Sequence, residues 1–232
     1  MTEITAETLA GIRLLAGLDE ATRKRLEQAC SWRQFHAQEQ IIDRQSESHD
    51  VFFVVSGAVR VVIYSLSGRE ITLDDVGAGG HFGEFAAIDG EPRSANVMAL
   101  TDTVTAAISQ ERFLALLADN PEVAFTLMRD LTRIIRTTTE RVMDLSTLAA
   151  NNRVQADLLR LAKASMKGDN RSEIAPIPVH GDIASRVSTT RETVARVLND
   201  LARQGVVERQ KDRLVIADVE HLEDMVIEVR GE

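Results

Sequence analysis

Residues 80–87 read Gly-His-Phe-Gly-Glu-Phe-Ala-Ala, and residues 92–95 read Pro-Arg-Ser-Ala. The glycines let the backbone approach a bound group closely and expose its N–H groups. Arg93 offers a planar guanidinium that matches the oxygens of a phosphate, and Ser94 adds a short donor. Glu84 cannot bind phosphate, but it accepts hydrogen bonds from sugar hydroxyls. Together the two stretches predict a site for a phosphate joined to a sugar.

Short segments rich in β-branched residues surround these stretches, and turn dipeptides such as Ser-Gly and Asp-Gly separate them. The predicted strands are residues 51–55, 59–64, 70–76, 95–99 and 103–108. Regularly spaced strands of this kind predict an antiparallel barrel or sandwich. Before them, the chain up to about Cys30 is predicted to form short packing helices. The apolar residues expected to line a pocket at the barrel mouth are Leu73, Val76, Phe82 and Phe85.

A long helix is predicted from Pro121, because the chain contains no glycine or proline from there to Gly168. Its apolar positions alternate steps of three and four, which is the pattern of a two-stranded coiled coil: Met128, Leu131, Ile135, Thr138, Val142, Leu145 and Ala149. Residues 121–150 are therefore predicted to join two copies of the chain, with a helix packed on its own barrel as the alternative. Asn151 and Asn152 interrupt the pattern and predict a hinge.

Thr138 breaks the apolar pattern of the long helix, and Thr139 follows it. A hydroxyl at a coiled-coil core position costs stability unless it finds a partner. Two interpretations stay open from the residues alone. The hydroxyls either contact a polar ligand shared by both subunits, or they bond to the preceding turn of their own helix.

The downstream part of the chain has the spacing of a helix-turn-helix. The predicted segments are a short helix at residues 182–187, a turn at 188–190 and a second helix at 191–204. Thr190 is expected to cap the second helix, which leaves Arg191, Glu192 and Arg196 exposed near its beginning. In a major groove, arginine pairs with guanine and glutamate accepts from cytosine. A solvated pair between Glu192 and Arg196 is the alternative.

Residues 206–216 predict a two-stranded wing with a basic tip, where Lys211 and Arg213 are expected to contact DNA phosphates. Thr189 and Thr193 are expected to contact phosphates as well. The net charge of −9 lies mostly in residues 1–150, at −8, whereas residues 151–232 carry −1. Residues 183–213 hold seven basic and four acidic side chains, which favours a small DNA-binding face.

Composition excludes several classes of protein. A chain of 232 residues that is 44% hydrophobic and 27% charged is typical of folded globular domains. No apolar run reaches the roughly 20 residues of a membrane span, and the first residues lack a signal-peptide pattern, so we expect a cytoplasmic protein. Cys30 is the only cysteine, which excludes an internal disulfide and disfavours a metal site. His81 and Glu84 have no second carboxylate or nucleophile beside them, so we expect no enzyme.

The Phe-Gly-Glu-Phe-Ala-Ala stretch followed by Arg-Ser-Ala resembles the phosphate-binding cassette of cyclic-nucleotide-binding domains. Residues 136–142, Arg-Thr-Thr-Thr-Glu-Arg-Val, resemble the long helix of the cAMP receptor protein (CRP/FNR) family, and residues 182–201 resemble its helix-turn-helix. The resemblance spans essentially the whole chain. It implies an α+β protein with a jelly-roll-like antiparallel β-barrel that binds a cyclic nucleotide at residues 1–120, a dimerisation helix at 121–150 and a winged helix-turn-helix at 151–232.

The function implied by this resemblance is that of a bacterial homodimeric transcription regulator controlled by a cyclic nucleotide. Glu84 is expected to bind the ribose 2′-hydroxyl, and Arg93 and Ser94 the cyclic phosphate. Thr138 and Thr139, one from each subunit, are expected to contact the purine. The implied partners are double-stranded DNA with a pseudo-palindrome of TGTGA-like half-sites, and RNA polymerase, for which residues 167–178 hold no recognisable contact motif.

The identity of the nucleotide depends on few residues. Ser94, where a threonine would favour guanine, resembles the adenine-preferring cassette, so cAMP is expected and cGMP is the alternative. Asp74 either accepts from the amino group of a purine or is a solvated strand carboxylate. A haem- or oxygen-sensing relative, or one that needs no ligand, is a further alternative, although Cys30 and His81 match no sensing motif. Ser188 departs from the family, where many relatives have glycine, so we expect strain in that turn.

Overall fold

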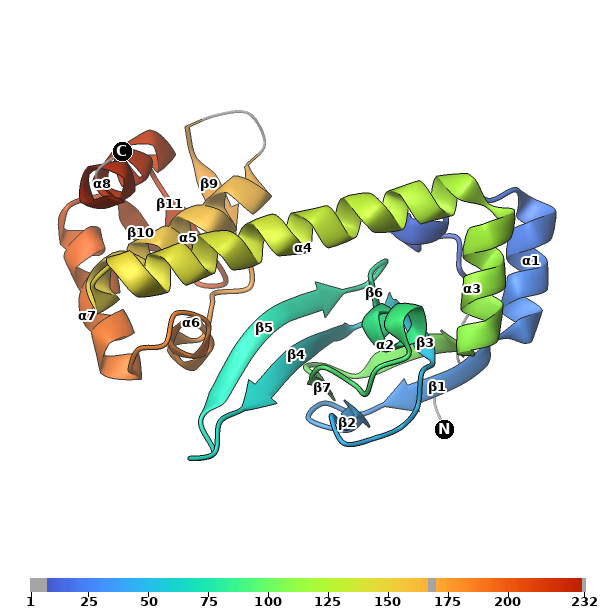
Figure 1. Cartoon of the computed structure of the whole chain (residues 1–232). Helices are drawn as coiled ribbons and strands as arrows, with labels where there is room; N and C mark the ends of the chain where they lie inside the picture. The colour runs from blue at the N-terminus through green and yellow to red at the C-terminus, as the bar shows by residue number, and fades with distance from the viewer. Residues whose placement is uncertain (1–7, 167–169, 231–232) are drawn as a thin grey trace. The chain divides into compact units, whose positions relative to one another are not determined.

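A computed structural model of the chain describes residues 8–166 and 170–230. The chain divides into two compact units, Met1–Arg133 and Ile134–Glu232, called here the N-terminal and C-terminal units. Figure 1 shows the strands coloured from blue to green in the first and the helices coloured orange and red in the second. The division falls within the long helix, so the predicted domain limits at residues 120 and 150 stay predictions.

Two antiparallel four-stranded sheets form the centre of the N-terminal unit. The first has the order β1 (Ser31–Phe35), β8 (Thr103–Ile108), β3 (Val51–Ser56) and β6 (His81–Phe82). The second has the order β2 (Gln40–Ile42), β7 (Asn96–Ala99), β4 (Ala58–Tyr64) and β5 (Glu70–Gly77). The predicted α+β class and antiparallel strands are confirmed, but the backbone ladders form two separate sheets rather than a closed barrel.

The strands form where β-branched and aromatic residues can bury their side chains on both sides of a sheet. Strand β3, with the sequence Val-Phe-Phe-Val-Val-Ser, has its first four residues buried. Phe52 and Val54 pack with Phe82 of β6 in one apolar cluster, whereas Val51 and Phe53 pack in another with the helices. Strand β3 therefore carries the apolar cores on both of its faces.

Helices of the N-terminal unit complete the second of these clusters. A 3₁₀ turn (Arg13–Leu15) precedes α1 (Glu20–Ala29), whose first turn is capped by Asp19 through the Thr22 amide at 2.9 Å. Helix α2 (Glu84–Asp89) follows β6, and α3 (Gln110–Asp119) follows β8. The apolar residues of these first turns are all buried, namely Leu14, Leu15, Leu18 and Leu26. The sequence pattern predicted neither α2 nor α3.

Helix α4 (Pro121–Thr147) confirms the predicted long helix, and α5 (Ala150–Ser165) follows it after a short break. The break lies at residues 148–149, shortly before Asn151 and Asn152, which lie inside the first turn of α5. A hinge near these asparagines stays a prediction. Several apolar side chains of the predicted seam are half or more exposed in the single chain, namely Met128, Ile135 and Val142 at 50%, 65% and 56%.

The C-terminal unit packs three further helices and a small sheet around one apolar cluster. Helix α6 (His180–Arg186), α7 (Arg191–Arg203) and α8 (Val219–Arg230) accompany the sheet order β10 (Val207–Arg209), β11 (Leu214–Ile216) and β9 (Ser172–Ile174). The predicted helix-turn-helix and wing are confirmed, and β9 is an addition to the wing. Residues 167–169, which belong to the segment 167–178 considered above, lie outside the described residues. No helix in the described part of the chain is long and apolar enough to cross a membrane.

Candidate functional site

Gly83 connects β6 to α2 and adopts the left-handed conformation, with φ of +86°. A side chain at this position would meet the Arg93 guanidinium and the Asp50 carbonyl oxygen, each 2.8 Å from the position of a Cβ atom. Both the positive φ and the close approach require glycine. The turn therefore places the first residue of α2, Glu84, beside the backbone that the Arg93 side chain contacts.

Arg93 is 4% exposed, and its guanidinium is held by groups of the neighbouring loops. One terminal nitrogen, Nη1, donates to the Gly83 carbonyl at 2.8 Å. The other, Nη2, donates to the Asp50 carbonyl at 2.8 Å and to the Ser48 hydroxyl at 3.1 Å. The remaining donor, Nε, is buried and has no hydrogen-bond partner among the described residues. Because this buried guanidinium bonds to carbonyls and a hydroxyl and to no carboxylate among the described residues, its positive charge is available to bind an anionic group.

Glu84 is 7% exposed at the start of α2. Burial raises the pKa of its carboxyl group to about 7, because the loss of water disfavours the charged form more than its own backbone amide favours it. Burial lowers the pKa of His81, two residues before Gly83, because the loss of water disfavours the charged imidazolium. Glu84 can therefore exchange a proton near neutral pH, and its oxygens can accept or donate a hydrogen bond to a hydroxyl group.

The other predicted pocket residues of the N-terminal unit have different surroundings. Phe82 is 3% exposed and stacks on Phe52 with ring centroids 5.0 Å apart, so it belongs to the apolar core. Leu73 and Phe85 are 37% and 39% exposed. Val76 is half-buried beside the same cluster as Phe82, and Ser94 is exposed next to Arg93. A cavity of about 400 Å³ in this unit has Asp50 and Phe52 in its wall but none of the predicted binding residues.

Asp74 lies exposed on β5, and its carboxylate accepts from the backbone amide of Asp75 at 3.0 Å. Asp75 in turn forms an ion pair with Arg60 at 2.7 Å. Thr138 and Thr139 are exposed on the part of α4 that belongs to the C-terminal unit. The Thr139 hydroxyl donates to the Ile135 carbonyl at 2.9 Å, which is the bond to the preceding turn considered above.

The helix-turn-helix consists of α6, the residues 187–190 and α7. The Thr190 hydroxyl caps α7 by accepting from the Thr193 amide at 3.2 Å, as predicted. Ser188 has φ of +51°, a conformation that favours glycine, which agrees with the strain expected from its departure from the family. Thr189 and Thr193 are half-buried near the beginning of α7.

Arg191, Glu192 and Arg196 are all exposed on α7. The Arg191 guanidinium lies over Gly181 of α6, where an added Cβ atom would be 3.0 Å from its Nε. Arg196 donates to the Asn151 side chain at 3.2 Å. The pKa of Glu192 is lowered, first by its own backbone amide and then by the Thr190 hydroxyl. These contacts support the placement of three charged groups on one accessible end of α7.

Two basic residues were predicted at the tip of the wing. Lys211 is exposed there. Arg213 forms ion pairs with Glu173 at 2.8 Å and with Asp212 at 3.0 Å, and these carboxylates raise its pKa. Arg213 must exchange these partners before it can bind a phosphate.

The residues that hold the Arg93 side chain and the turn of the helix-turn-helix in place were not predicted from the sequence. Ser48 and Asp50 bind Arg93 from the loop between β2 and β3. Arg153 donates from α5 to the carbonyls of Leu148, Val187 and Ser188 at 2.8, 2.8 and 3.0 Å. An arginine on a helix gives no sign in the sequence that it binds backbone carbonyls far along the chain.

Models of two families match the chain. The cyclic nucleotide-binding domain matches residues 32–120, and the Crp-like helix-turn-helix domain matches residues 152–225. The "Cyclic AMP receptor protein" of Thermus thermophilus is 35% identical over 75% of this chain and 78% of its own length. The structure of the Thermus thermophilus catabolite activator protein is 30% identical and covers 93% of this chain and 99% of its own, with a TM-score of 0.53. A mutant of CooA from Carboxydothermus hydrogenoformans shares the fold, with 22% identity, a TM-score of 0.79, and coverage of 92% of this chain and 94% of its own.

The fold, the glycine turn with its buried arginine, and the exposed helix of the helix-turn-helix define a transcription regulator with a cyclic-nucleotide-binding domain. The chain belongs to the cAMP receptor protein (CRP/FNR) family.

Proposed function

We propose that the protein is a homodimeric regulator that binds cAMP in its N-terminal unit and, in response, binds a pseudo-palindromic operator with TGTGA-like half-sites. The observation that carries the ligand proposal is the buried Arg93. Its Nε lacks a partner among the described residues, while its other nitrogens fix its position beside Gly83. Such a donor fits the anionic oxygen of a cyclic phosphate better than it fits a neutral or cationic group.

The resemblance to the family supplies the proposed roles of the surrounding residues. Arg93 and Ser94 bind the cyclic phosphate, and Glu84 binds the ribose 2′-hydroxyl. Thr138 and Thr139, from different subunits, contact the purine. The name of the Thermus thermophilus relative supports cAMP, whereas the phosphate clamp itself binds cAMP and cGMP alike. Discrimination therefore depends on the threonines and on Asp74.

Dimerisation through α4 is supported by the exposure of its apolar residues. Met128, Ile135 and Val142 recur at the spacing of a coiled-coil core and are at least half exposed in the single chain. A second α4 removes these side chains from water. Apolar burial stabilises association by roughly 25 cal/mol for each Å² removed from water.

DNA recognition is assigned to the beginning of α7. Arg191 and Arg196 pair with guanine, Glu192 accepts from cytosine, and Thr189 and Thr193 contact phosphates. Nucleotide increases DNA affinity only to the extent that it binds the DNA-competent state more tightly than the other state. The response is therefore a shift between two populations of the dimer.

Fluorescence anisotropy of a labelled TGTGA-type duplex tests the proposal at one fixed salt concentration, without nucleotide, with cAMP and with cGMP. Tight binding with cAMP alone supports both sites and their coupling. Equal or cGMP-selective responses contradict the assignment of cAMP and direct attention to Asp74 and the threonines. Binding that ignores nucleotide contradicts the sensor and leaves a DNA-binding protein.

Matched variants connect the response to the proposed clamp. Arg93→Gln removes the buried charge and is expected to abolish the response to cAMP. Arg44→Gln removes an exposed arginine from the same unit and is expected to leave the response intact. A visible absorption spectrum of the purified protein tests the alternative of a haem sensor.

A further inference from the structure

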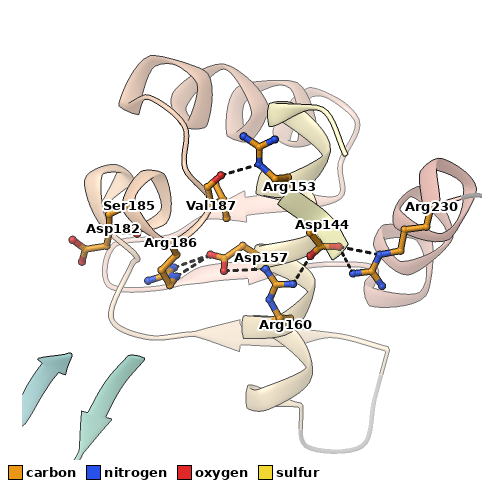
Figure 2. A network of polar contacts seen from close by, with 9 residues as sticks. All are labelled: Asp144, Arg153, Asp157, Arg160, Asp182, Ser185, Arg186, Val187 and Arg230. Carbon is orange, nitrogen blue, oxygen red and sulfur yellow. Dashed lines mark hydrogen bonds and ion pairs between the residues drawn. The ribbon is translucent and has the colours of Figure 1, made fainter. Parts of the chain in front are cut away.

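A chain of ion pairs with buried carboxylates runs through the C-terminal unit and ends at the helix-turn-helix (Figure 2). It begins at Asp144 in the last turn of α4, whose side chain is 4% exposed. One carboxylate oxygen of Asp144 accepts from Arg160 of α5 at 2.6 Å. The other accepts from Arg230 of α8 at 2.7 Å. Asp144 therefore fixes the end of α4 to two other helices at once.

Asp157 continues the chain from α5 to α6. Its side chain is 2% exposed, and one of its oxygens lies 3.6 Å from Arg160. Its other oxygen accepts from Nε and Nη2 of Arg186 at 3.0 and 2.9 Å. The path is therefore Asp144, Arg160, Asp157 and Arg186, called here the relay. Each member is a charged group between two opposite charges or at the end of the path.

Burial makes the geometry of the relay strict. A charge removed from water is tolerated only while its partner stays in place, so a displaced member leaves an unpaired buried charge. The guanidinium of Arg160 is a rigid plane that contacts both carboxylates, and its Nε is buried without a partner among the described residues. A movement of α4 at Asp144 therefore disturbs the ion pair with Arg160 directly.

The relay ends where the turn of the helix-turn-helix, residues 187–190, begins. Arg186 is the last residue of α6, and Val187 and Ser188 follow it. Arg153 of α5 donates to the carbonyls of both these residues (Figure 2 shows the bond to Val187). Helix α5 thus contacts α6 through Asp157 and the turn through Arg153. The turn leads directly into α7, which carries the residues assigned to the bases.

We propose that the relay of Asp144, Arg160, Asp157 and Arg186 couples the end of α4 to α6, so that a change at the nucleotide site alters the placement of α7. This inference rests on the proposed function for its ligand, because Thr138 and Thr139 lie on the same helix as Asp144. The four residues act as positioning residues and contact neither ligand. Arg230 connects helix α8 to Asp144, the first member of the relay.

Hydrogen exchange of the whole 232-residue chain tests the relay without any ligand. Asp144→Asn removes one charge at the α4 end, and exchange is measured in peptides covering residues 180–190. The relay predicts that these amides exchange at least about fivefold faster, because local opening of α6 becomes easier. Lys163→Gln is the matched control, since Lys163 lies on α5 and pairs with Glu223 of α8 outside the relay. The control is expected to leave α6 unchanged.

A second variant, at the other end of the relay, allows the test to be made even if Asp144→Asn does not fold. Arg186→Gln removes the α6 end, and exchange is then measured in residues 140–147. The double variant is expected to change each segment no more than the single variants do, because coupled sites are not additive. Unchanged exchange at the distant segment in each variant that folds, or fully additive effects in the double variant, overturns the relay.

DNA affinity then separates this inference from the proposed function. In the wild type, the ratio of operator affinities with and without cAMP measures the response, and Asp144→Asn is expected to reduce that ratio about tenfold, a typical coupling between sites. A wild-type ratio of one contradicts the nucleotide assignment, while the exchange measurements still decide the relay. A normal ratio in Asp144→Asn overturns the relay and leaves the nucleotide assignment intact.

Discussion

The two proposed sites are built in opposite ways. Arg93 and Glu84 are 4% and 7% exposed, and backbone carbonyls of the glycine turn and its neighbouring loop hold the Arg93 guanidinium. Arg191, Glu192 and Arg196 are exposed on one end of a helix that a separate apolar cluster holds in place. The proposed nucleotide site is thus part of the fold of its unit, whereas the residues proposed to bind DNA bases lie on the surface of a fold that does not need them.

Because the two sites differ in burial, substitutions in them are expected to affect stability and function differently. A change in the buried site alters unfolding and ligand binding together, because the same contacts serve both. A change on the exposed end of α7 alters recognition with little effect on stability, since surface substitutions are usually nearly neutral for folding. Four substitutions test this contrast.

Gly83→Ala is expected to have the largest effect. The new Cβ atom would lie 2.8 Å from both the Arg93 guanidinium and the Asp50 carbonyl, at φ of +86°. Together the conformation and the overlap cost about 4 kcal/mol of folding free energy. Gly90→Ala is the control, because its φ is +73° but no atom lies within 4 Å. There only the conformational cost of about 1 kcal/mol is expected. Thermal unfolding compares the two variants, and equal losses would contradict the close approach at Gly83.

Glu84→Gln is expected to change how stability depends on pH. Burial raises the pKa of Glu84 from 4.5 to about 7, so the folded protein holds this proton more tightly than the unfolded chain does. The wild type therefore loses stability relative to the variant as pH rises from 4.5 to about 7. The full difference is about 3 kcal/mol above that range. Unfolding of both proteins at pH 5 and pH 8 measures it, with Glu91→Gln as an exposed control. If the difference in unfolding free energy between wild type and variant is the same at both pH values, the pKa of Glu84 is not raised by burial.

Arg191→Ala tests the exposed site. It is expected to weaken operator binding about 30-fold, or about 2 kcal/mol, because one bidentate contact to guanine is lost. Unfolding of the free protein should hardly change. Arg203→Ala, at the other end of α7, is the control and should leave operator affinity within about twofold, as expected for an exposed pair with Asp200. Equal losses on the operator and on a scrambled duplex would show that Arg191 contacts only phosphate.

The sequence predicted the fold class, the long helix and the two halves of the helix-turn-helix because each depends on local pattern. It did not predict β1, in which only Phe35 is buried and which pairs with the distant β8. The short β9 depends in the same way on its pairing with β11. Such strands form through partners far along the chain, so neighbouring residues carry little sign of them.

The break after α4 shows the same limit more clearly. Residues 147–150 read Thr-Leu-Ala-Ala, which contains neither glycine nor proline, yet Ala149 leaves the helical conformation with ψ of 157°. Leu148 is buried in the apolar cluster of the C-terminal unit, and its carbonyl accepts from Arg153 at 2.8 Å. Tertiary contacts therefore end this helix, and a pattern of helix-breaking residues could not reveal its position. At the candidate site, Arg93 and Glu84 followed from their motif, while Ser48 and Asp50 did not.

Ser188→Gly is expected to have the smallest effect, and its sign is informative. Ser188 has φ of +51°, so glycine relieves the strain of the turn, while its greater freedom in the unfolded chain offsets part of the gain. A net stabilisation of about 0.5 kcal/mol is expected. Ser185→Gly, in the helical conformation of α6, is the control and should destabilise by roughly 0.5 kcal/mol. Thermal unfolding compares the two. If both variants lose stability, the bond from Arg153 to the Ser188 carbonyl must already compensate the strain of the turn. Helix α7 would then depend on part-buried contacts, as the proposed nucleotide site does.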